Sequence, residues 1–363
     1  MKPITIFLII LYLVLFSAFG VWFYFKYFQQ VTNPNNKTQV INLNKDKTIF
    51  YTEGNNLYQL NSDNLNRNSS DVATYRLQST GKVQTIKVDQ KNEFFVYDCI
   101  TSQNASEIWQ VSFSDNHSEK IFSANTPGFE MYSNFRSPKM SKTGRQMAFV
   151  ASNQGVDDIF VWDIEPNTTE NLTSKSVKEK ITAFDWSTTE LKIYFSTLNN
   201  DKVSLKSIDL KKTTANLFEG TNKITNMNVL ADKIIVMFLD SNEIANLGHI
   251  NLKDPKIITP ITDIKTPSTI TSFDLSIGGS QVVYQTQDTL AKINDLYIMN
   301  IDGTNLLQLT TDGKSYYPIF SPDSGKIAFY IKDSGVYTMD TFKTAQTKIL
   351  NDEGKIDNLI LWR

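Results

Sequence analysis

Cysteine and histidine are nearly absent from this chain of 363 residues. Its one cysteine, Cys99, cannot form an intrachain disulfide, and we expect it to be a small buried residue. The two histidines, His117 and His249, lie far apart in the sequence and do not show the spacing of metal ligands. These shortages argue against a disulfide scaffold and a zinc site, and we expect no metal and no cofactor.

The chain also lacks an excess of charge of either sign. Lysine and arginine total 36 residues and aspartate and glutamate 38, so the formal net charge is −2. A domain that binds nucleic acid is usually basic, and we therefore expect no nucleic-acid partner. The hydrophobic content of 40% is too high for a disordered protein and indicates a folded body.

Residues 4–25 form one uncharged apolar run, close to the roughly 20 residues that a membrane-spanning helix needs. Trp22, Tyr24 and Tyr27 crowd its C-terminal end, as aromatic residues do at a membrane interface. The competing interpretation is a cleaved signal peptide, but the run is long for one and no small-x-small cleavage site ends it. We predict an uncleaved signal-anchor helix within residues 1–28.

The segments that follow the anchor complete the predicted organisation. Residues 29–37 are polar and read as a linker, and residues 38–363 form the body. The charges that flank the anchor are nearly balanced, so its orientation rests on the short N-terminal tail. We expect a single-pass membrane protein, anchored through residues 4–25, whose body lies outside the cytoplasm in a bacterial cell envelope.

The clearest structural unit of the body lies at residues 295–330. Four apolar runs of strand length occur at 296–299, 306–309, 317–320 and 327–330. Turn sequences separate them, among them Asp302-Gly303 and Asp312-Gly313. Four antiparallel strands within about 40 residues correspond to one blade of a β-propeller.

This unit resembles the repeat of TolB-like β-propellers. That repeat has a Pro-x-aromatic-Ser-Pro-Asp-Gly turn, an Ile-Ala-Phe-like strand, a Leu-Tyr-x-Met-Asn strand and an x-Leu-Thr ending. The matching residues are Pro318, Phe320, Ser321, Pro322, Asp323, Ile327, Ala328 and Phe329, followed in the other half by Leu296, Tyr297, Met299, Asn300, Asp302, Gly303, Leu309 and Thr310. Ser324 departs from the pattern and moves the glycine to Gly325. The resemblance implies a propeller fold and says little about function.

Further copies of the blade recur at intervals of roughly 40 to 52 residues, near the spacing typical of propellers. The expected second strands are 49–51, 95–97, 147–149, 193–195, 234–236, 282–284 and 327–329. The expected third strands are 57–60, 108–111, 159–163, 205–209, 247–251, 296–300 and 336–340. We predict an all-β protein, a seven-bladed propeller of four-stranded antiparallel blades preceded by one transmembrane helix.

Six or eight blades remain open alternatives. Six blades are common in the family that the chain resembles, and eight would result if residues 356–362 were one more first strand. We expect these residues to close the ring by pairing with the first blade instead, because an open ring exposes strand edges. Residues 40–43 also resemble an innermost strand of that blade, and the pattern does not say how both segments fit.

The predicted first strands share one further pattern. Each has an apolar residue at its end and another two positions earlier, as expected for a strand with one face buried between blades. The residues between these two positions are Asn42, Lys87, Lys139, Asp185, Asn228, Asp274 and Ile319. In a propeller the first strand lines the central channel, so the six polar side chains either solvate the channel or form a binding site at its mouth.

Catalytic constellations are hard to find. The chain has no Gly-x-Ser-x-Gly nucleophile elbow, which argues against the propeller-bearing serine peptidases. A sialidase needs an arginine cluster, and this chain has only five arginines, of which Arg136 and the terminal Arg363 alone fall on channel strands. We therefore predict a non-catalytic scaffold that binds a protein or an envelope ligand. The alternative is a glycosidase-like envelope hydrolase that uses Asp185 and Asp274 as paired carboxylates.

Overall fold

The computed structural model describes residues 47–54, 56–63, 67–68, 73–77, 82–88, 94–173, 179–342, 345–352 and 356–362. The predicted anchor at 4–25, the linker and residues 40–43 lie outside this set. Within it, no helix combines the length and the apolar character needed to cross a membrane.

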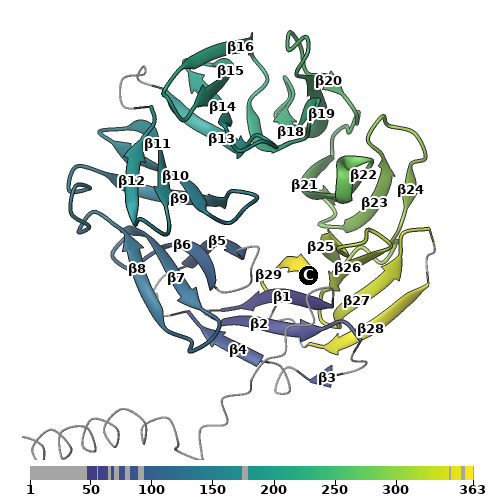
Figure 1. The fold of residues 1–363 in the computed structure, drawn as a ribbon. Helices are drawn as coiled ribbons and strands as arrows, with labels where there is room; N and C mark the ends of the chain where they lie inside the picture. Colours follow the sequence, from purple (N-terminus) through teal and green to yellow (C-terminus); the bar gives the residue numbers. More distant parts are fainter. Residues whose placement is uncertain are drawn as a thin grey trace, which may run out of the picture. The chain divides into compact units, whose positions relative to one another are not determined.

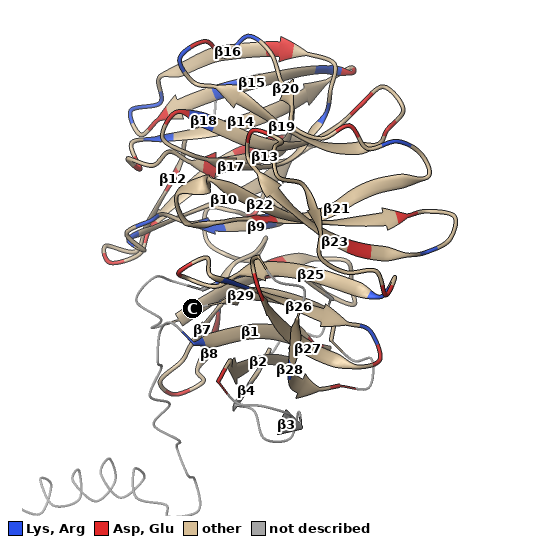
Figure 2. Ribbon diagram, turned by 90° about the vertical axis from the view of Figure 1, so that its right-hand side faces the viewer, with Lys and Arg blue, Asp and Glu red and all other residues tan. Residues whose placement is uncertain are grey.

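Seven sheets surround a central channel (Figure 1). The chain thus folds as the predicted seven-bladed all-β propeller, and neither six nor eight sheets occur among the described residues. Blade 1 combines β29, β1, β2 and β4, and blades 2 to 7 begin with β5, β9, β13, β17, β21 and β25 and continue in chain order. Acidic and basic residues are interspersed over the turns and strand ends, as Figure 2 shows for one side of the ring.

The strands of each blade run from the channel outward. The innermost strands are β29 (Asn358–Trp362), β5 (Lys82–Val88), β9 (Ser133–Met140), β13 (Lys180–Trp186), β17 (Ile224–Val229), β21 (Ser268–Leu275) and β25 (Ser315–Phe320). The second strands are β1 (Thr48–Glu53), β6 (Phe94–Ile100), β10 (Gln146–Asn153), β14 (Lys192–Asn199), β18 (Lys233–Leu239), β22 (Gln281–Asp288) and β26 (Lys326–Ile331). A 3₁₀ turn at Ile277–Gly279 joins β21 to β22.

The outer strands complete the blades. The third strands are β2 (Asn56–Asn61), β7 (Ser106–Ser112), β11 (Val156–Asp163), β15 (Lys202–Asp209), β19 (Ala245–Asn251), β23 (Asn294–Asn300) and β27 (Gly335–Asp340). The fourth strands are β4 (Ala73–Arg76), β8 (Ser118–Phe122), β12 (Thr168–Asn171), β16 (Thr214–Gly220), β20 (Thr259–Pro260), β24 (Leu307–Gln308) and β28 (Gln346–Asn351). A short strand, β3 (Arg67–Asn68), adds to β28 in parallel. Every predicted second and third strand falls within an observed one, which confirms the repeat assignment.

The C-terminal strand closes the ring. β29 pairs antiparallel with β1, so that Trp362 lies opposite Ile49 and Asn358 opposite Thr52. This confirms the predicted closure and resolves the competition for the innermost place of blade 1, because β29 occupies the inner edge of β1. The ends of the described chain are thereby joined in one blade, and β1 has no exposed inner edge.

The core lies between the faces of neighbouring blades. All six central residues of β10 are buried, because both faces of this strand are covered. Between blades 2 and 3, the Phe122 ring lies 4.4 Å from that of Phe149 and 5.7 Å from that of Trp162, measured between centroids. The predicted burial of Cys99 is confirmed, since its thiol is buried in β6. The apolar, aromatic second strands are therefore what the stacking of blades requires.

The threonine that ends the repeat has a structural role in three blades. A threonine just beyond the fourth strand accepts a hydrogen bond from the backbone N–H of a third-strand residue. The same hydroxyl donates a hydrogen bond to the side chain of the residue immediately before that one. The three sets are Thr173 with Ile159 and Asp158, Thr262 with Leu247 and Asn246, and Thr310 with Leu296 and Asp295. The hydroxyl thus satisfies a buried backbone donor at the place where the outer strand ends.

Candidate binding site in the channel

The predicted polar positions occupy one level of the innermost strands. Each lies opposite the corresponding residue of its second strand, and the pairs are Lys87 with Val96, Lys139 with Ala148, Asp185 with Tyr194, Asn228 with Ile235 and Asp274 with Val283. Apolar residues complete the level, because Ile319 lies opposite Ala328 and Leu361 opposite Phe50. The seventh predicted residue, Asn42, lies outside the described residues.

The structure brings four of these residues together around one cavity. Lys87, Lys139, Asp185 and Asn228 line a cavity of about 240 Å³, together with Leu361 of the closing strand. Asp274 is not part of the lining. The cavity therefore lies against blades 2 to 5 and the C-terminal strand. The opposite side of the channel contributes less to its lining.

Lys139 and Asp185 form the best-defined pair at this level. The Lys139 Nζ lies 3.5 Å from Asp185 Oδ1 and donates a hydrogen bond of 3.2 Å to the carbonyl oxygen of Met227. Both side chains are about one-fifth exposed, at 21% and 22%. Lys139 is thus a fixed cation that is already shared between a carboxylate and a backbone carbonyl.

The two aspartates also join neighbouring blades. Asp185 Oδ2 accepts the N–H of Val229 at 2.9 Å, and Asp274 Oδ2 accepts the N–H of Phe320 at 2.8 Å. Val229 and Phe320 each end the innermost strand of the next blade. One oxygen of each carboxylate is therefore committed to holding the ring together, which is a structural role that the sequence pattern did not indicate.

Lys87 differs from Lys139 because its amine has no fixed partner. No residue within the described part of the chain forms an ion pair or a hydrogen bond with its Nζ. The side chain reaches water, yet the blades surround it, and this desolvation lowers the pKa of Lys87. The like charge of Lys139 lowers it further, against the attraction of Asp185 and Asp274.

Asp274 shows the opposite response to the same surroundings. Burial in the channel wall raises the pKa of its carboxyl, while the N–H groups of Phe320 and Leu275 and the charge of Lys87 oppose the shift. The Lys87 amine, like that of the exposed Lys142 in the same lining, forms no hydrogen bond or ion pair with the described residues. It is suited to receive an anionic oxygen from a ligand.

A buried carboxylate in blade 2 was missed by the sequence pattern. Asp98 lies in the apolar strand β6 and is 2% exposed. Its Oδ1 accepts hydrogen bonds from the backbone N and the Oγ1 of Thr85, and its Oδ2 accepts the N–H of Ser137 at 2.8 Å. Burial raises the pKa of Asp98, and these donors oppose the shift. Because Ser137 has a left-handed φ of 56°, the carboxylate holds an irregular turn of β9 in the neighbouring blade.

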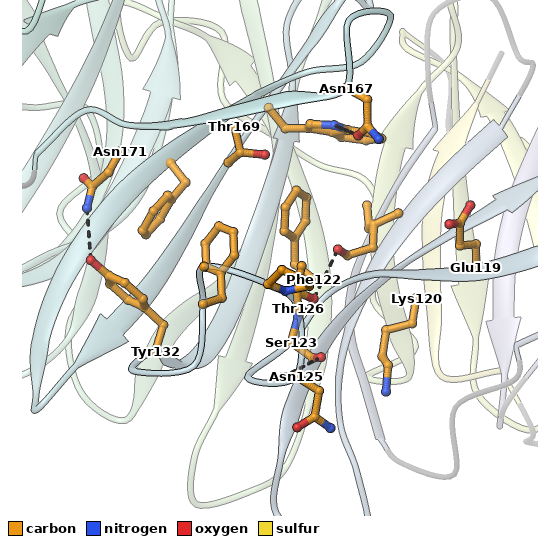
Figure 3. Close-up of a pocket in the computed structure, with 16 residues that line it drawn as sticks. Glu119, Lys120, Phe122, Ser123, Asn125, Thr126, Tyr132, Asn167, Thr169 and Asn171 are labelled. Atoms are coloured by element: carbon orange, nitrogen blue, oxygen red, sulfur yellow. Dashed lines mark hydrogen bonds between the residues drawn. The ribbon is translucent and has the colours of Figure 1, made fainter.

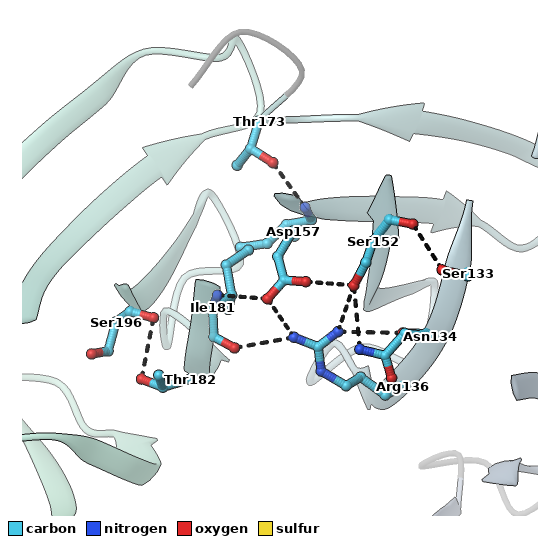
Figure 4. Close-up of polar contacts among 10 residues, drawn as sticks. Ser133, Asn134, Arg136, Ser152, Asp157, Thr173, Ile181, Thr182 and Ser196 are labelled. Atoms are coloured by element: carbon cyan, nitrogen blue, oxygen red, sulfur yellow. Dashed lines mark hydrogen bonds and ion pairs between the residues drawn. The ribbon is translucent and has the colours of Figure 1, made fainter. Parts of the chain in front are cut away.

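A second missed feature is an ion pair within blade 3 that also contacts blade 4 (Figure 4). The Arg136 Nη2 donates to Asp157 Oδ2 at 2.6 Å and to the carbonyl oxygen of Ile181 at 3.2 Å. The same Asp157 oxygen accepts the N–H of Ile181 at 2.8 Å, and Ser152 Oγ donates to Asp157 Oδ1 at 2.5 Å. This network fixes β13 to the blade before it. Arg136 lies on a channel strand, but its guanidinium is already bound by these contacts.

Among the described residues, no group of three or more His, Cys, Asp or Glu side chains is arranged to hold a metal ion. His249 is half-buried, and burial lowers the pKa of its ring. The channel site consists of lysine, carboxylate and amide groups on a rigid ring. Such a set can orient and neutralise an anionic ligand.

Neither a protein-family profile nor a curated protein sequence matches the chain. Solved structures do match it. TolB from Acinetobacter baumannii has a TM-score of 0.51 and 19% identity over 71% of this chain and 62% of that chain, so this chain spans less than two thirds of that protein. The propeller domain of the Trilobed protease from Pyrococcus furiosus has a TM-score of 0.53 and 16% identity over 76% and 86% of the two chains. Oligogalacturonate lyase from Vibrio parahaemolyticus has a TM-score of 0.51 and 11% identity over 75% and 87%.

These likenesses concern the fold. The predicted TolB-like propeller is confirmed, because TolB structures from two organisms are among the matches. The matches also include the propeller of a protease and an oligogalacturonate lyase, which are proteins with different activities. One fold carries many functions, and the function has to be argued from the site.

Proposed function

We propose that this protein is a membrane-anchored, extracytoplasmic propeller that binds a protein or a cell-envelope ligand at the mouth of its channel and performs no catalysis. The observation that carries the proposal is the Lys87 amine, which has no partner among the described residues and lies beside the Lys139–Asp185 pair in a cavity of about 240 Å³. A carboxylate or another anionic group of the ligand would bind between the two lysines. Propellers commonly present such a channel rim as a binding surface.

The geometry of the carboxylates favours binding over hydrolysis. Asp185 and Asp274 each use one oxygen to accept a backbone N–H of the next blade. A general acid or nucleophile has to remain free to exchange protons or to attack the substrate. The alternative hydrolase is tested by Asp185→Asn and Asp274→Asn, which keep an oxygen acceptor for that N–H. Loss of a measured hydrolytic activity with binding retained would favour the hydrolase.

The binding site is tested by charge reversal at Lys87, with Lys253→Glu as the matched control. Lys253 is an exposed lysine in the turn that follows β19. Lys87→Glu removes a charge-assisted hydrogen bond to the ligand and introduces repulsion. The affinity for the captured envelope partner should therefore fall by about tenfold or more. The control should bind as the wild type does, and both variants should keep its melting temperature. Retention of the partner by Lys87→Glu in a quantitative pull-down would move the binding surface away from the channel.

The proposed anchoring has its own test. An uncleaved helix at residues 4–25 keeps the original N-terminus on the membrane-bound protein. N-terminal sequencing of the protein extracted from membranes should therefore return the first residues of the chain. A mature N-terminus near Gly20 would show a cleaved signal peptide instead.

A further inference from the structure

A second cavity lies away from the channel, between the outer strands of blades 2 and 3 (Figure 3). It measures about 840 Å³, which is within the range of roughly 300–1,000 Å³ typical of ligand sites. One wall comes from β8 and the segment 123–132 that follows it, and the other comes from β11 and β12. We refer to it as the outer groove.

The base of the outer groove is aromatic and rigid. Trp162 and Phe160 of β11 reach it, and each is only 5% exposed because other rings cover them. The ring of Phe129 lies 4.9 Å from that of Phe160, and Tyr132 meets Phe160 edge-on with 5.0 Å between centroids. A ligand would therefore meet aromatic rings whose positions are already fixed by their neighbours.

A row of neutral hydrogen-bonding side chains runs beside these rings. Asn171 lies opposite Phe160 and Thr169 lies opposite Trp162 in the β11–β12 ladder. Asn167 belongs to the same row, and its Oδ1 accepts the indole N–H of Trp162 at 3.0 Å. Thr169 and Asn171 are alternate residues of β12 and share one face, so both point into the groove, and Asn167 lines it from the turn before β12.

Several polar groups of the outer groove remain available to a ligand. Within the described part of the chain, no hydrogen bond occupies the Thr169 hydroxyl, the Asn125 side-chain amide or the Asn167 Nδ2. Asn171 is held in place, because its Nδ2 donates to the Tyr132 hydroxyl at 3.2 Å and to Asp158 at 3.0 Å. The groove thus offers both fixed and unoccupied neutral polar groups.

Charge plays little part in this lining. Among the described residues, Glu119 and Lys120 are the only charged ones in the lining, and both lie at the end of the groove far from Asn171 (Figure 3). Lys120 is already paired with Glu107, at 3.1 Å. An anionic ligand would find no unpaired cation here. β8 and β12 are the outermost strands of their blades, so a peptide that pairs with one of these edges is the competing occupant.

We propose that the outer groove binds a neutral oligosaccharide. The apolar C–H surface of a sugar ring suits an apolar aromatic base, and its hydroxyls suit amide and hydroxyl partners that carry no charge. The volume accommodates about two or three sugar units, by comparison with the roughly 300–1,000 Å³ of drug-sized sites. The outer groove is separate from the channel, and this proposal does not depend on the function proposed for the channel.

The test uses saturation-transfer NMR of the purified propeller with cellotriose, maltotriose and triacetylchitotriose at millimolar concentration. At least one of these trisaccharides should receive saturation. Thr169→Arg should abolish the signal, because its long side chain fills the groove. The matched control is Thr168→Arg, whose side chain points to the opposite face of the same strand. It should bind like the wild type.

Two milder variants keep the test decisive if Thr169→Arg folds poorly. Thr169→Val keeps the shape of the side chain and removes its hydroxyl, and Asn125→Ala removes an exposed amide. Each variant should lower the affinity for the trisaccharide about fivefold, which is what the loss of one hydrogen bond costs. Lys87→Glu should leave this binding unchanged, which separates it from the channel site.

Three results would overturn the proposal. They are the absence of saturation transfer to all three sugars, binding that survives Thr169→Arg in a folded protein, and binding that neither milder variant weakens. Displacement of the bound sugar by a Gly-Ser hexapeptide at equal concentration would assign the outer groove to peptides instead.

Discussion

Closure of the ring by β29 makes a quantitative prediction about two leucines of that strand. Leu359 is 4% exposed and belongs to a cluster that includes Tyr51 of β1 and Ile319 of β25. Leu361, two residues later, is half-buried and faces the channel cavity. Substitution of each by alanine removes the same atoms from the same strand. The difference between the two variants therefore reports the packing of β29 between blades 7 and 1.

The expected magnitudes follow from burial. Leu359→Ala should destabilise the fold by about 2–5 kcal/mol, the range for leucines in closed cores. Leu361→Ala should cost about 1 kcal/mol or less, because its site is open to the channel and leaves no sealed void. At roughly 2 °C per kcal/mol for a domain of this size, the melting temperature should fall by about 4–10 °C for the first variant and about 2 °C for the second.

The assay is urea unfolding at equilibrium, followed by tryptophan fluorescence and checked by calorimetry. Unchanged slopes of free energy against urea would show that the folded and unfolded states keep their compactness. Equal losses for the two leucines, or a loss below about 1 kcal/mol for Leu359→Ala, would contradict the closure described above.

Three further predictions rest on the same contacts. Deletion of residues 355–363 should leave the inner edge of β1 unpaired, so size-exclusion chromatography should show oligomers, and a monomer with unchanged melting would refute this. Arg136→Met should cost about 3–5 kcal/mol in urea unfolding because Asp157 stays buried without its cation, and a cost below about 1 kcal/mol would count against that role. Asp274 has a raised pKa in the folded state, so it favours folding when protonated. The wild type should therefore gain stability relative to Asp274→Asn as the pH falls from neutral through this raised pKa, and an opposite trend in urea midpoints would exclude the shift.

The blades could be predicted because their signals are local. A run such as 147–149 is apolar throughout because β10 is covered on both faces. The Asp-Gly turns and the roughly 40- to 52-residue spacing then set the number of copies. The channel level was also predictable, since a polar residue between two apolar ones, such as Asp185 between Phe184 and Trp186, shows the period of a half-buried strand.

The partners of these polar residues were not predictable. Asp185 accepts the N–H of Val229, and Asp98 accepts that of Ser137, in each case from the next blade. Such contacts depend on how one blade is rotated against another. The only signal for Asp98 in the sequence was a carboxylate in an otherwise apolar strand, which marks a buried polar group without naming its donor.

The sequence by itself determined the class of fold, the order of the strands and the residues that face the channel, because each depends on a periodicity within a few neighbouring positions. Only the tertiary structure decided that β29 closes blade 1, that Lys139 has a partner where Lys87 has none among the residues the structure describes, and that the rings of β11 border a groove beside β8. These features arise between segments that are distant in the chain. They exist only once the blades pack against one another and the ring is closed.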